Sequence, residues 1–270
     1  MARGGVDRLE VLWENFRLSK EESLDLEVNE VEDAMKDKGD RSLVGKVCLD
    51  RVIGKEILSS MMAKIWKISK AAVFQEVGTN IFIITFHTII DLEKVWEGRL
   101  WLFDNHLLAL RVFDTGAQPG AMKFEEEVFW IQLHNLPMGF MDESRGFQIG
   151  GSVGRVWAVD VPPDGVGWGR FLRVRVEVPL RKPIARGRLI TVNGKKVWVG
   201  FKYEKLLRMC FTCGWVVHGE DGCKGGGSME AMEPQFGAWL RAEKNFITRG
   251  VKQKSRWDYS TARDYEPGPQ

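Results

Sequence analysis

The chain has 270 residues, of which 44% are apolar and 11% aromatic. This composition excludes a wholly disordered chain and provides for one large or two small hydrophobic cores. The formal net charge of only +2 argues, taken alone, against a nucleic-acid partner. Because no uncharged apolar stretch approaches the ~20 residues that span a bilayer, we expect a soluble intracellular protein, nuclear or cytoplasmic, that is neither secreted nor bound to a membrane.

The small net charge hides a strong asymmetry along the chain. Residues 1–40 contain 6 Lys or Arg against 12 Asp or Glu, whereas residues 170–209, the basic band, contain 12 against 2. In the acidic N-terminal segment 1–40, the apolar spacing over Asp7–Phe16 predicts a short amphipathic helix. The alternation over Leu24–Val28 fits either a strand or an extended linker.

Residues 41–115 predict an α+β domain in which strands and helices alternate. Four strands are expected at Leu43–Leu49, Ala72–Val77, Asn80–Phe86 and His106–Phe113, and two helices at Lys55–Lys67 and Ile90–Trp101. The order βαββαβ predicts a ferredoxin-like fold, in which a four-stranded antiparallel sheet has both helices on one face, as in RNA-recognition modules. The predicted strands lack the Gly-aromatic signature of those modules, so we do not expect this sheet to be the binding face.

Residues 121–206 predict a second, β-rich α+β unit that contains most of the basic band. Strands are expected at Val128–Leu133, Arg155–Val161 and Phe171–Val178, a helix near Asp142–Val153, and a hairpin of Leu189–Val192 with Lys195–Val199. The pair Asn193-Gly194 suits the two-residue type I′ turn of such a hairpin. We expect a knuckle at 207–224 and a flexible tail at 225–270 that contains a helix near Ala238–Phe246.

The spacing of three cysteines and one histidine predicts a single structural Zn²⁺. Cys210, Cys213, His218 and Cys223 follow the pattern CX2CX4HX4C. Two thiolates two residues apart hold one ion from a tight turn, and His218 with Cys223 completes a tetrahedron that leaves no open position for water. The alternative is scattered thiols in a loop. Cys48 lies apart and is interpreted as a small core residue.

Alternation in the basic band predicts strands with one core face and one cationic face. Leu172, Val174, Val176 and Val178 alternate with Arg173 and Arg175, and in the hairpin Trp198 lies between lysines. Cations bind phosphates and exposed rings stack on bases, so this pattern is typical of single-stranded nucleic-acid binding, although each cation alone fits an ordinary solvated surface. The candidate contact residues are Arg173, Arg175, Arg181, Lys182, Arg186, Arg188, Lys195, Lys196, Trp198, Lys202, Phe211 and Trp215.

The chain resembles plant retrotransposon-derived proteins that join a plant domain of unknown function to a zinc knuckle, and these are similar to a protein of LINE-type elements. The resemblance extends from Leu9 to Cys223 and rests on the knuckle and on the phrases 101–108, 129–137 and 203–206. It implies zinc binding and RNA binding, with Phe211 where knuckles carry a base-stacking aromatic residue. Trp215 either stacks on a base or packs on Phe211. Val217 replaces the glycine that usually precedes the histidine, which predicts an altered turn.

The sequence allows two classes of function and disfavours a third. The first is a sequence-tolerant binder of single-stranded RNA or DNA, with no small-molecule substrate. The second is a protein-interaction adaptor that uses the knuckle and the N-terminal helix to bind protein partners. An enzyme is not expected, because Glu125–Glu127 suit a solvated edge and His87, His106 and His134 have no nucleophile that spacing identifies.

Overall fold

The computed structural model describes residues 19–21, 24, 26, 33–118, 122–218, 222–223 and 235–243. Contacts divide the chain into two units, 1–36 and 37–270. Helix α2 (Asp33–Asp40), which the sequence did not predict, begins in the first unit and ends in the second. The helix predicted at Asp7–Phe16 lies outside the described residues, and Leu24 and Leu26 are irregular rather than in a strand.

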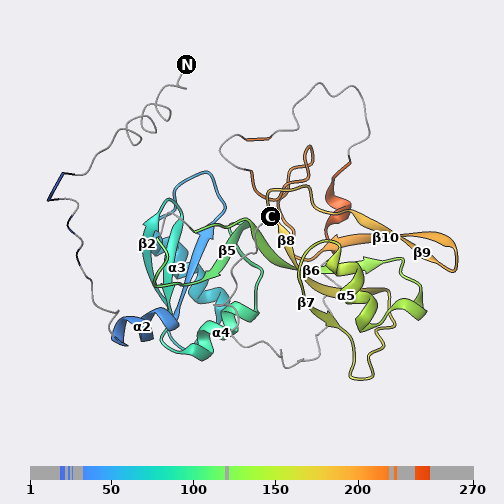
Figure 1. The fold of residues 1–270 in the computed structure, drawn as a ribbon, viewed down its shortest axis with the longest axis horizontal. Helices are drawn as coiled ribbons and strands as arrows, with labels where there is room; N and C mark the ends of the chain where they lie inside the picture. Colours follow the sequence, from blue (N-terminus) through green and yellow to red (C-terminus); the bar gives the residue numbers. More distant parts are fainter. Residues whose placement is uncertain are drawn as a thin grey trace, which may run out of the picture. The chain divides into compact units, whose positions relative to one another are not determined.

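The N-terminal half of the second unit contains an antiparallel sheet, sheet A, whose strand order is β2-β3-β1-β5-β4 (Figure 1). Its elements follow one another as β1 (Ser42–Val47), α3 (Lys55–Trp66), β2 (Val73–Gly78), β3 (Ile81–Thr85), α4 (Ile89–Glu97), β4 (Trp101–Phe103) and β5 (His106–Val112). The four strands and two helices predicted for residues 41–115 are all present, within a few residues of their predicted bounds.

Helices α3 and α4 share one hydrophobic core with one face of sheet A. The buried residues of α3, Leu58, Met62 and Trp66, recur every fourth residue and therefore lie on one side of the helix. They belong to the same buried cluster as Phe82 and Ile84, which alternate along β3. The aromatic side chains of the predicted strand Asn80–Phe86 are thus part of this core and are not available to a ligand.

Strand β4 corrects the prediction of a helix at Ile90–Trp101. Helix α4 ends at Glu97, where Gly98 follows as its C-cap. After β4, Asp104 and Asn105 have φ angles of 47° and 63° and turn the chain back into β5. Two consecutive positive φ angles are typical of a type I′ hairpin turn, for which Asn and Asp are favoured. The sequence therefore contained the signal for this hairpin.

The opposite face of sheet A is also apolar and buried. Val44 of β1 and Leu107 and Ala109 of β5 belong to a second core cluster, which includes residues from the second sheet. Both faces of sheet A are consequently covered, one by its helices and the other by the remainder of the unit.

The C-terminal half of the unit contains a second antiparallel sheet, sheet B, in the order β7-β8-β6-β10-β9 (Figure 1). Its elements are β6 (Glu126–His134), a 3₁₀ turn η2 (Met138–Phe140), α5 (Glu143–Gly151), β7 (Val156–Asp160), β8 (Phe171–Pro179), β9 (Gly187–Val192) and β10 (Lys195–Tyr203). Together the two sheets and their few helices make a mixed α+β structure, as predicted.

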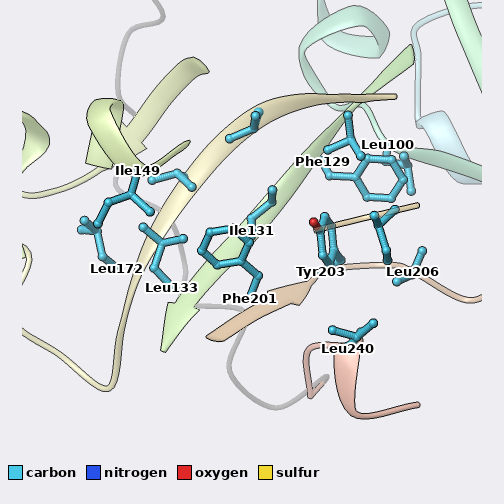
Figure 2. Close-up of a cluster of buried hydrophobic side chains, with 14 of the residues drawn as sticks. Leu100, Phe129, Ile131, Leu133, Ile149, Leu172, Phe201, Tyr203, Leu206 and Leu240 are labelled. Atoms are coloured by element: carbon cyan, nitrogen blue, oxygen red, sulfur yellow. The ribbon is translucent and has the colours of Figure 1, made fainter. Parts of the chain in front are cut away.

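Alternation along the strands of sheet B positions its core. Leu172, Val174, Val176 and Val178 are all buried, as the pattern predicted. Figure 2 shows Leu172 near Ile149 of α5, and Ile131 and Leu133 of β6 near Phe201 of β10. At the hairpin tip, Asn193 and Gly194 have φ angles of 49° and 77°, which confirms the predicted turn between β9 and β10.

Glu127 corrects the interpretation of Glu125–Glu127 as a solvated edge. Its side chain has no exposed surface and lies 3.7 Å from Arg99 Nη1 and 4.0 Å from Arg111 Nη1. The backbone N–H groups of Leu110 and Val128 donate to its two carboxylate oxygens. This buried ion network therefore joins β6 of sheet B to β5 and the α4–β4 connection of sheet A.

Residues 235–243 correct part of the predicted flexible tail at 225–270. A 3₁₀ turn, η3 (Ala238–Leu240), buries Leu240 against sheet B. The Ala242 N–H donates to the Tyr203 carbonyl at 2.9 Å, and Arg241 pairs with Tyr203 in a parallel bridge. This segment is therefore packed against the end of β10.

Candidate metal centre and nucleic-acid interface

The knuckle is attached by its backbone to the connection that follows β8. The N–H groups of Val216 and Val217 both donate to the Leu180 carbonyl at 3.1 Å, and the Ile184 N–H donates to the Gly214 carbonyl at 3.0 Å. Within the knuckle, the Gly214 N–H donates to the Cys210 carbonyl at 2.9 Å, and Gly214 has a φ of +76°. This tight turn brings the first two cysteines together.

The four predicted ligands converge on one point. Cys210 Sγ lies 3.7 Å from Cys223 Sγ, and Cys213 Sγ lies 3.2 Å from His218 Nε2. All four ligand atoms lie within 4.8 Å of one another. A tetrahedral Zn²⁺ with Zn–S bonds of about 2.3 Å separates its sulfurs by about 3.8 Å, so the cluster fits a single structural Zn²⁺.

The thiols of the cluster are held in unequal environments. Burial raises the pKa of Cys210. The backbone N–H groups of Cys213 and Thr212 donate to its sulfur and lower the pKa by more than burial raises it, so the net shift is downward. Burial and the neighbouring thiols raise the pKa of Cys213. Crowded thiolates repel one another, and a bound divalent cation offsets that repulsion because it neutralises their charge.

Val217 answers one question that the sequence left open, whereas the two alternatives for Trp215 stay predictions. Val217 does not adopt a positive φ; its N–H donates to Leu180 and its side chain packs on the core. The substitution of the usual glycine therefore introduces no backbone strain. The ring of Trp215 lies 6.2 Å from that of His218, and Phe211 is 45% exposed with the Arg241 guanidinium 5.6 Å from its ring.

Arg173 and Arg175 are engaged within the protein. Arg173 donates to both carboxylate oxygens of Glu204, at 2.8 and 2.9 Å, and to Asp160 at 3.1 Å. These hydrogen bonds outweigh the effect of burial and raise its pKa. Arg175 donates to the Glu97 carbonyl at 2.6 Å. On the face of β8 that the sequence predicted to be cationic, the charge of Arg173 is therefore balanced by two carboxylates, whereas Arg175 is held by a neutral carbonyl.

The other candidate contact residues fall into three groups. Lys195, Lys196 and Trp198 lie exposed on the β9–β10 hairpin, with Lys202 half-buried further along β10. Arg186 donates to Gln235 and Arg188 to Ser152, so both guanidinium groups bind neighbouring loops. Lys182 is exposed, while Arg181, Phe211 and Trp215 line a groove of about 910 Å³.

This groove contains residues that sequence reasoning did not identify. Sheet A contributes Lys46 and His106 to its lining, and the C-terminal part of the chain contributes Lys205, Arg208 and Arg241. The His106 Nδ1 lies 2.7 Å from the Asp104 carbonyl, and its Nε2 faces the Arg208 guanidinium. No sequence pattern links these residues, because they come from widely separated segments that only the fold brings together.

Two segments of the chain match known family models. Residues 35–121 match a domain of unknown function (DUF4283), and residues 178–225 match a zinc knuckle. The predicted combination of a domain of unknown function with a zinc knuckle is therefore confirmed.

A similar protein is the uncharacterized protein At4g02000 of Arabidopsis thaliana, which is 22% identical over 135 residues. The match covers 50% of this chain and 42% of that protein, so the chain spans less than half the length of this relative. Among the helices that the structure describes, none is both long and apolar enough to cross a membrane.

Proposed function

We propose that this protein binds single-stranded RNA or DNA with low sequence specificity, and that one Zn²⁺ maintains the fold of the knuckle that takes part in binding. The observation that carries the proposal is the Cys3His cluster beside the exposed ring of Phe211. An exposed aromatic ring stacks on an unpaired base of any identity, because every base has a π face. The cations near the knuckle bind the phosphates.

A second exposed aromatic residue with neighbouring lysines lies on the β9–β10 hairpin and offers an alternative contact surface. Trp198 is 49% exposed, and Lys195 and Lys196 are exposed beside it on the hairpin. In contrast, Arg173 and Arg175 serve the fold, and we do not include them in the proposed surface. The nucleic acid is expected to contact the knuckle, the hairpin is an alternative contact surface, and the middle of β8 is not part of either surface.

We also propose that sheet A and its helices form a ferredoxin-like domain and that the chain derives from a LINE-type retrotransposon. The strand order β2-β3-β1-β5, with α3 and α4 in one core with one face, supports the first point. The resemblance of the knuckle and of the phrase 203–206 to element proteins supports the second. A protein with this origin would bind RNA without catalysing a reaction.

The absence of catalysis is part of the proposal. Among the described residues, Cys210, Cys213, His218 and Cys223 are the one group placed to hold a metal ion, and four protein ligands leave no coordination position for a substrate or water. The buried carboxylate of Glu127 is engaged by Arg99 and by two backbone N–H groups. Both features are explained by structural roles.

Binding of labelled single-stranded oligonucleotides, measured by fluorescence anisotropy at several salt concentrations, tests the proposal. We expect the logarithm of the association constant to fall linearly with the logarithm of salt concentration, by about 0.7 for each phosphate contacted. Binding should be similar for unrelated sequences. No binding at low salt, or an affinity that does not change with salt, would contradict the proposal.

A protein-interaction adaptor is the second candidate. Ile57, Met61 and Ile65 of α3 are 62%, 36% and 39% exposed and follow one another at four-residue spacing, so they form an apolar stripe on the outer side of the helix. Such stripes mark protein contacts. If this is the main function, Ile57→Lys with Ile65→Lys should abolish recovery of a protein partner, and the nucleic-acid affinity of the wild type should be negligible.

A further inference from the structure

The groove between sheet A and the knuckle has two walls of different origin. One wall comes from the end of β1 and the start of β5, where Lys46 and His106 lie, and the other comes from residues 205–218 with Arg241. Lys46 follows Val44 by two residues, so it lies on the face of β1 opposite α3 and α4. Most of the first wall belongs to the segment that matches the domain of unknown function.

The charge of the groove favours an anionic ligand. Its lining includes five Lys or Arg residues and one acidic residue, Asp50. Among the described residues, no ion pair joins any of the five cations to a carboxylate. Lys205 Nζ donates to the Leu100 carbonyl at 2.9 Å and Arg241 to the Leu207 carbonyl at 2.7 Å, and both of these acceptors are neutral. The five cations are Lys46, Arg181, Lys205, Arg208 and Arg241.

The rest of the lining favours a ligand with flat apolar rings. Phe211 and Trp215 lie in the lining on the side of the knuckle, and Leu100, Leu107 and Leu206 contribute apolar surface. A repeating anion that also carries aromatic rings is a single-stranded nucleic acid. In a duplex the bases are already stacked on one another, so their faces are not available to Phe211.

We propose that this groove, rather than the basic strands of sheet B, is the principal path of a single-stranded nucleic acid. The inference rests on the function proposed above and assigns the binding site within it. Phosphates contact Lys46, Arg181 and Arg208, and a base stacks on Phe211 at the end of the groove. The segment that matches the domain of unknown function thereby acquires a role, because it supplies one wall of the site.

The test compares two pairs of charge-removing substitutions in the full chain. Lys46→Ala with Arg181→Ala removes two cations of the groove, whereas Lys195→Ala with Lys196→Ala removes two exposed cations of the hairpin that do not line it. Affinity for labelled oligouridylate and oligothymidylate is measured over a range of salt concentrations. Zinc content and the midpoint of urea unfolding establish that both variants fold.

We expect the groove pair to lower the affinity roughly tenfold and to reduce the salt slope by about 1.4, because each lost phosphate contact on a single strand contributes about 0.7. The hairpin pair should change the affinity by less than about twofold. If the groove pair alters zinc content, Arg208→Ala provides a second variant, since its side chain is exposed, and its slope should fall by about 0.7.

The outcomes separate this inference from the proposed function. If the wild type binds and the hairpin pair loses as much affinity as the groove pair or more, the groove assignment is wrong and the proposed function stands. If a duplex of the same sequence competes as well as the single strand, the assignment to single strands is overturned. A wild type that binds neither oligonucleotide at low salt removes both proposals. Equal loss on RNA and DNA is the expected result, since the recognised groups are phosphates and base faces.

Discussion

Glu127 is a buried charge at the contact between the two sheets. Its carboxylate faces Arg99, whose guanidinium is also buried and lies 3.4 Å from the centre of the Trp96 ring. Burial lowers the pKa of Arg99 to about 10, while Glu127 opposes that shift, so the guanidinium stays charged at neutral pH. Removing the carboxylate charge would leave a buried cation without compensation.

We therefore expect Glu127→Gln to lower the free energy of unfolding by about 3 kcal/mol, as is typical when one partner of a buried ion pair is removed. Its matched control is Glu126→Gln, which removes the same charge from the exposed neighbouring residue and should change stability by less than about 0.5 kcal/mol. Urea unfolding measures both. Equal effects would show that the burial of Glu127 has no energetic consequence.

His134 gives a second prediction at the scale of a single residue. Burial, together with the nearby cations Lys202 and Arg170, lowers its pKa. The folded protein therefore binds a proton at this ring less readily than the unfolded chain, in which the pKa of His is about 6.5. The resulting stability is present above that pH and is lost as the pH falls through the lower pKa of the folded state.

Replacing His134 with Gln should accordingly make the free energy of unfolding less dependent on pH below about 6.5. The exposed His87, changed in the same way, provides a control for the general effect of a His-to-Gln substitution on stability. Urea titrations at a series of pH values supply the measurement. An unchanged pH dependence in the His134 variant would mean that another group is responsible.

Among the elements, the knuckle contains two glycines with a positive φ, Gly214 and Gly222, and their surroundings differ. Gly214 and Gly222 both have positive φ angles, +76° and +67°. A Cβ atom at Gly214 would lie 2.5 Å from a ring carbon of Phe236, whereas no described atom lies within 4 Å of one at Gly222. An alanine at either position would therefore have the same unfavourable backbone conformation, but only an alanine at Gly214 would also clash with Phe236.

Gly222→Ala should cost about 1 kcal/mol, the usual cost of a left-handed conformation for a residue with a Cβ. Gly214→Ala must in addition displace Phe236, so we expect a larger loss of stability and a weaker zinc affinity. Competition with a chelator measures the affinity of each variant. If the two alanine variants bind zinc equally well, the contact with Phe236 is not needed to hold the knuckle.

The elements also indicate how far the sequence could predict the structure. Periodicity located β8, α3 and the hairpin turn at Asn193-Gly194, because each signal is contained in a short stretch of chain. It missed β4, of which only Trp101 fell within the predicted helix, although Asp104-Asn105 marked the turn that follows this strand. The spacing of the zinc ligands was likewise a local signal, and the structure brings all four together.

The features that the sequence could not supply are those that join distant segments. The buried pair of Glu127 and Arg99, the groove cations Lys46 and Arg241, and the docking of residues 235–243 all depend on how the sheets pack. Conversely, Arg173 matched the pattern of a binding residue but its charge is balanced by Glu204. Alternation along a strand shows which of its two faces is polar, but it does not show which residues of other segments lie against that face.

At the scale of the whole molecule, sheets A and B share one hydrophobic core. The predicted boundaries of separate domains at 41–115 and 121–206 stay predictions, and the shared core gives the interface between them a structural role. The acidic segment at the N-terminus adds a charge opposite to that of the basic band. Such a segment can compete with a nucleic acid for the same cations.

Deletion of residues 1–32 tests this competition and preserves α2, where the Lys38 carbonyl accepts a hydrogen bond from the Ser42 hydroxyl. We expect the shortened chain to bind single-stranded RNA more tightly, with the largest gain at low salt because screening weakens the competition. The anisotropy titrations described above provide the measurement. Unchanged affinity at low salt would contradict the competition between the acidic segment and the nucleic acid, but it would not contradict the proposed binding site.

The central claim is that Cys210, Cys213, His218 and Cys223 close around one Zn²⁺, and metal analysis of the purified protein by native mass spectrometry tests it most directly. We predict one zinc per chain in the wild type and loss of that zinc in Cys213→Ser, with Cys48→Ser retaining it as the matched control. Of the four thiols, those of the knuckle should resist labelling until a chelator is added. A metal-free wild type whose knuckle thiols all react at once under native conditions would contradict the account.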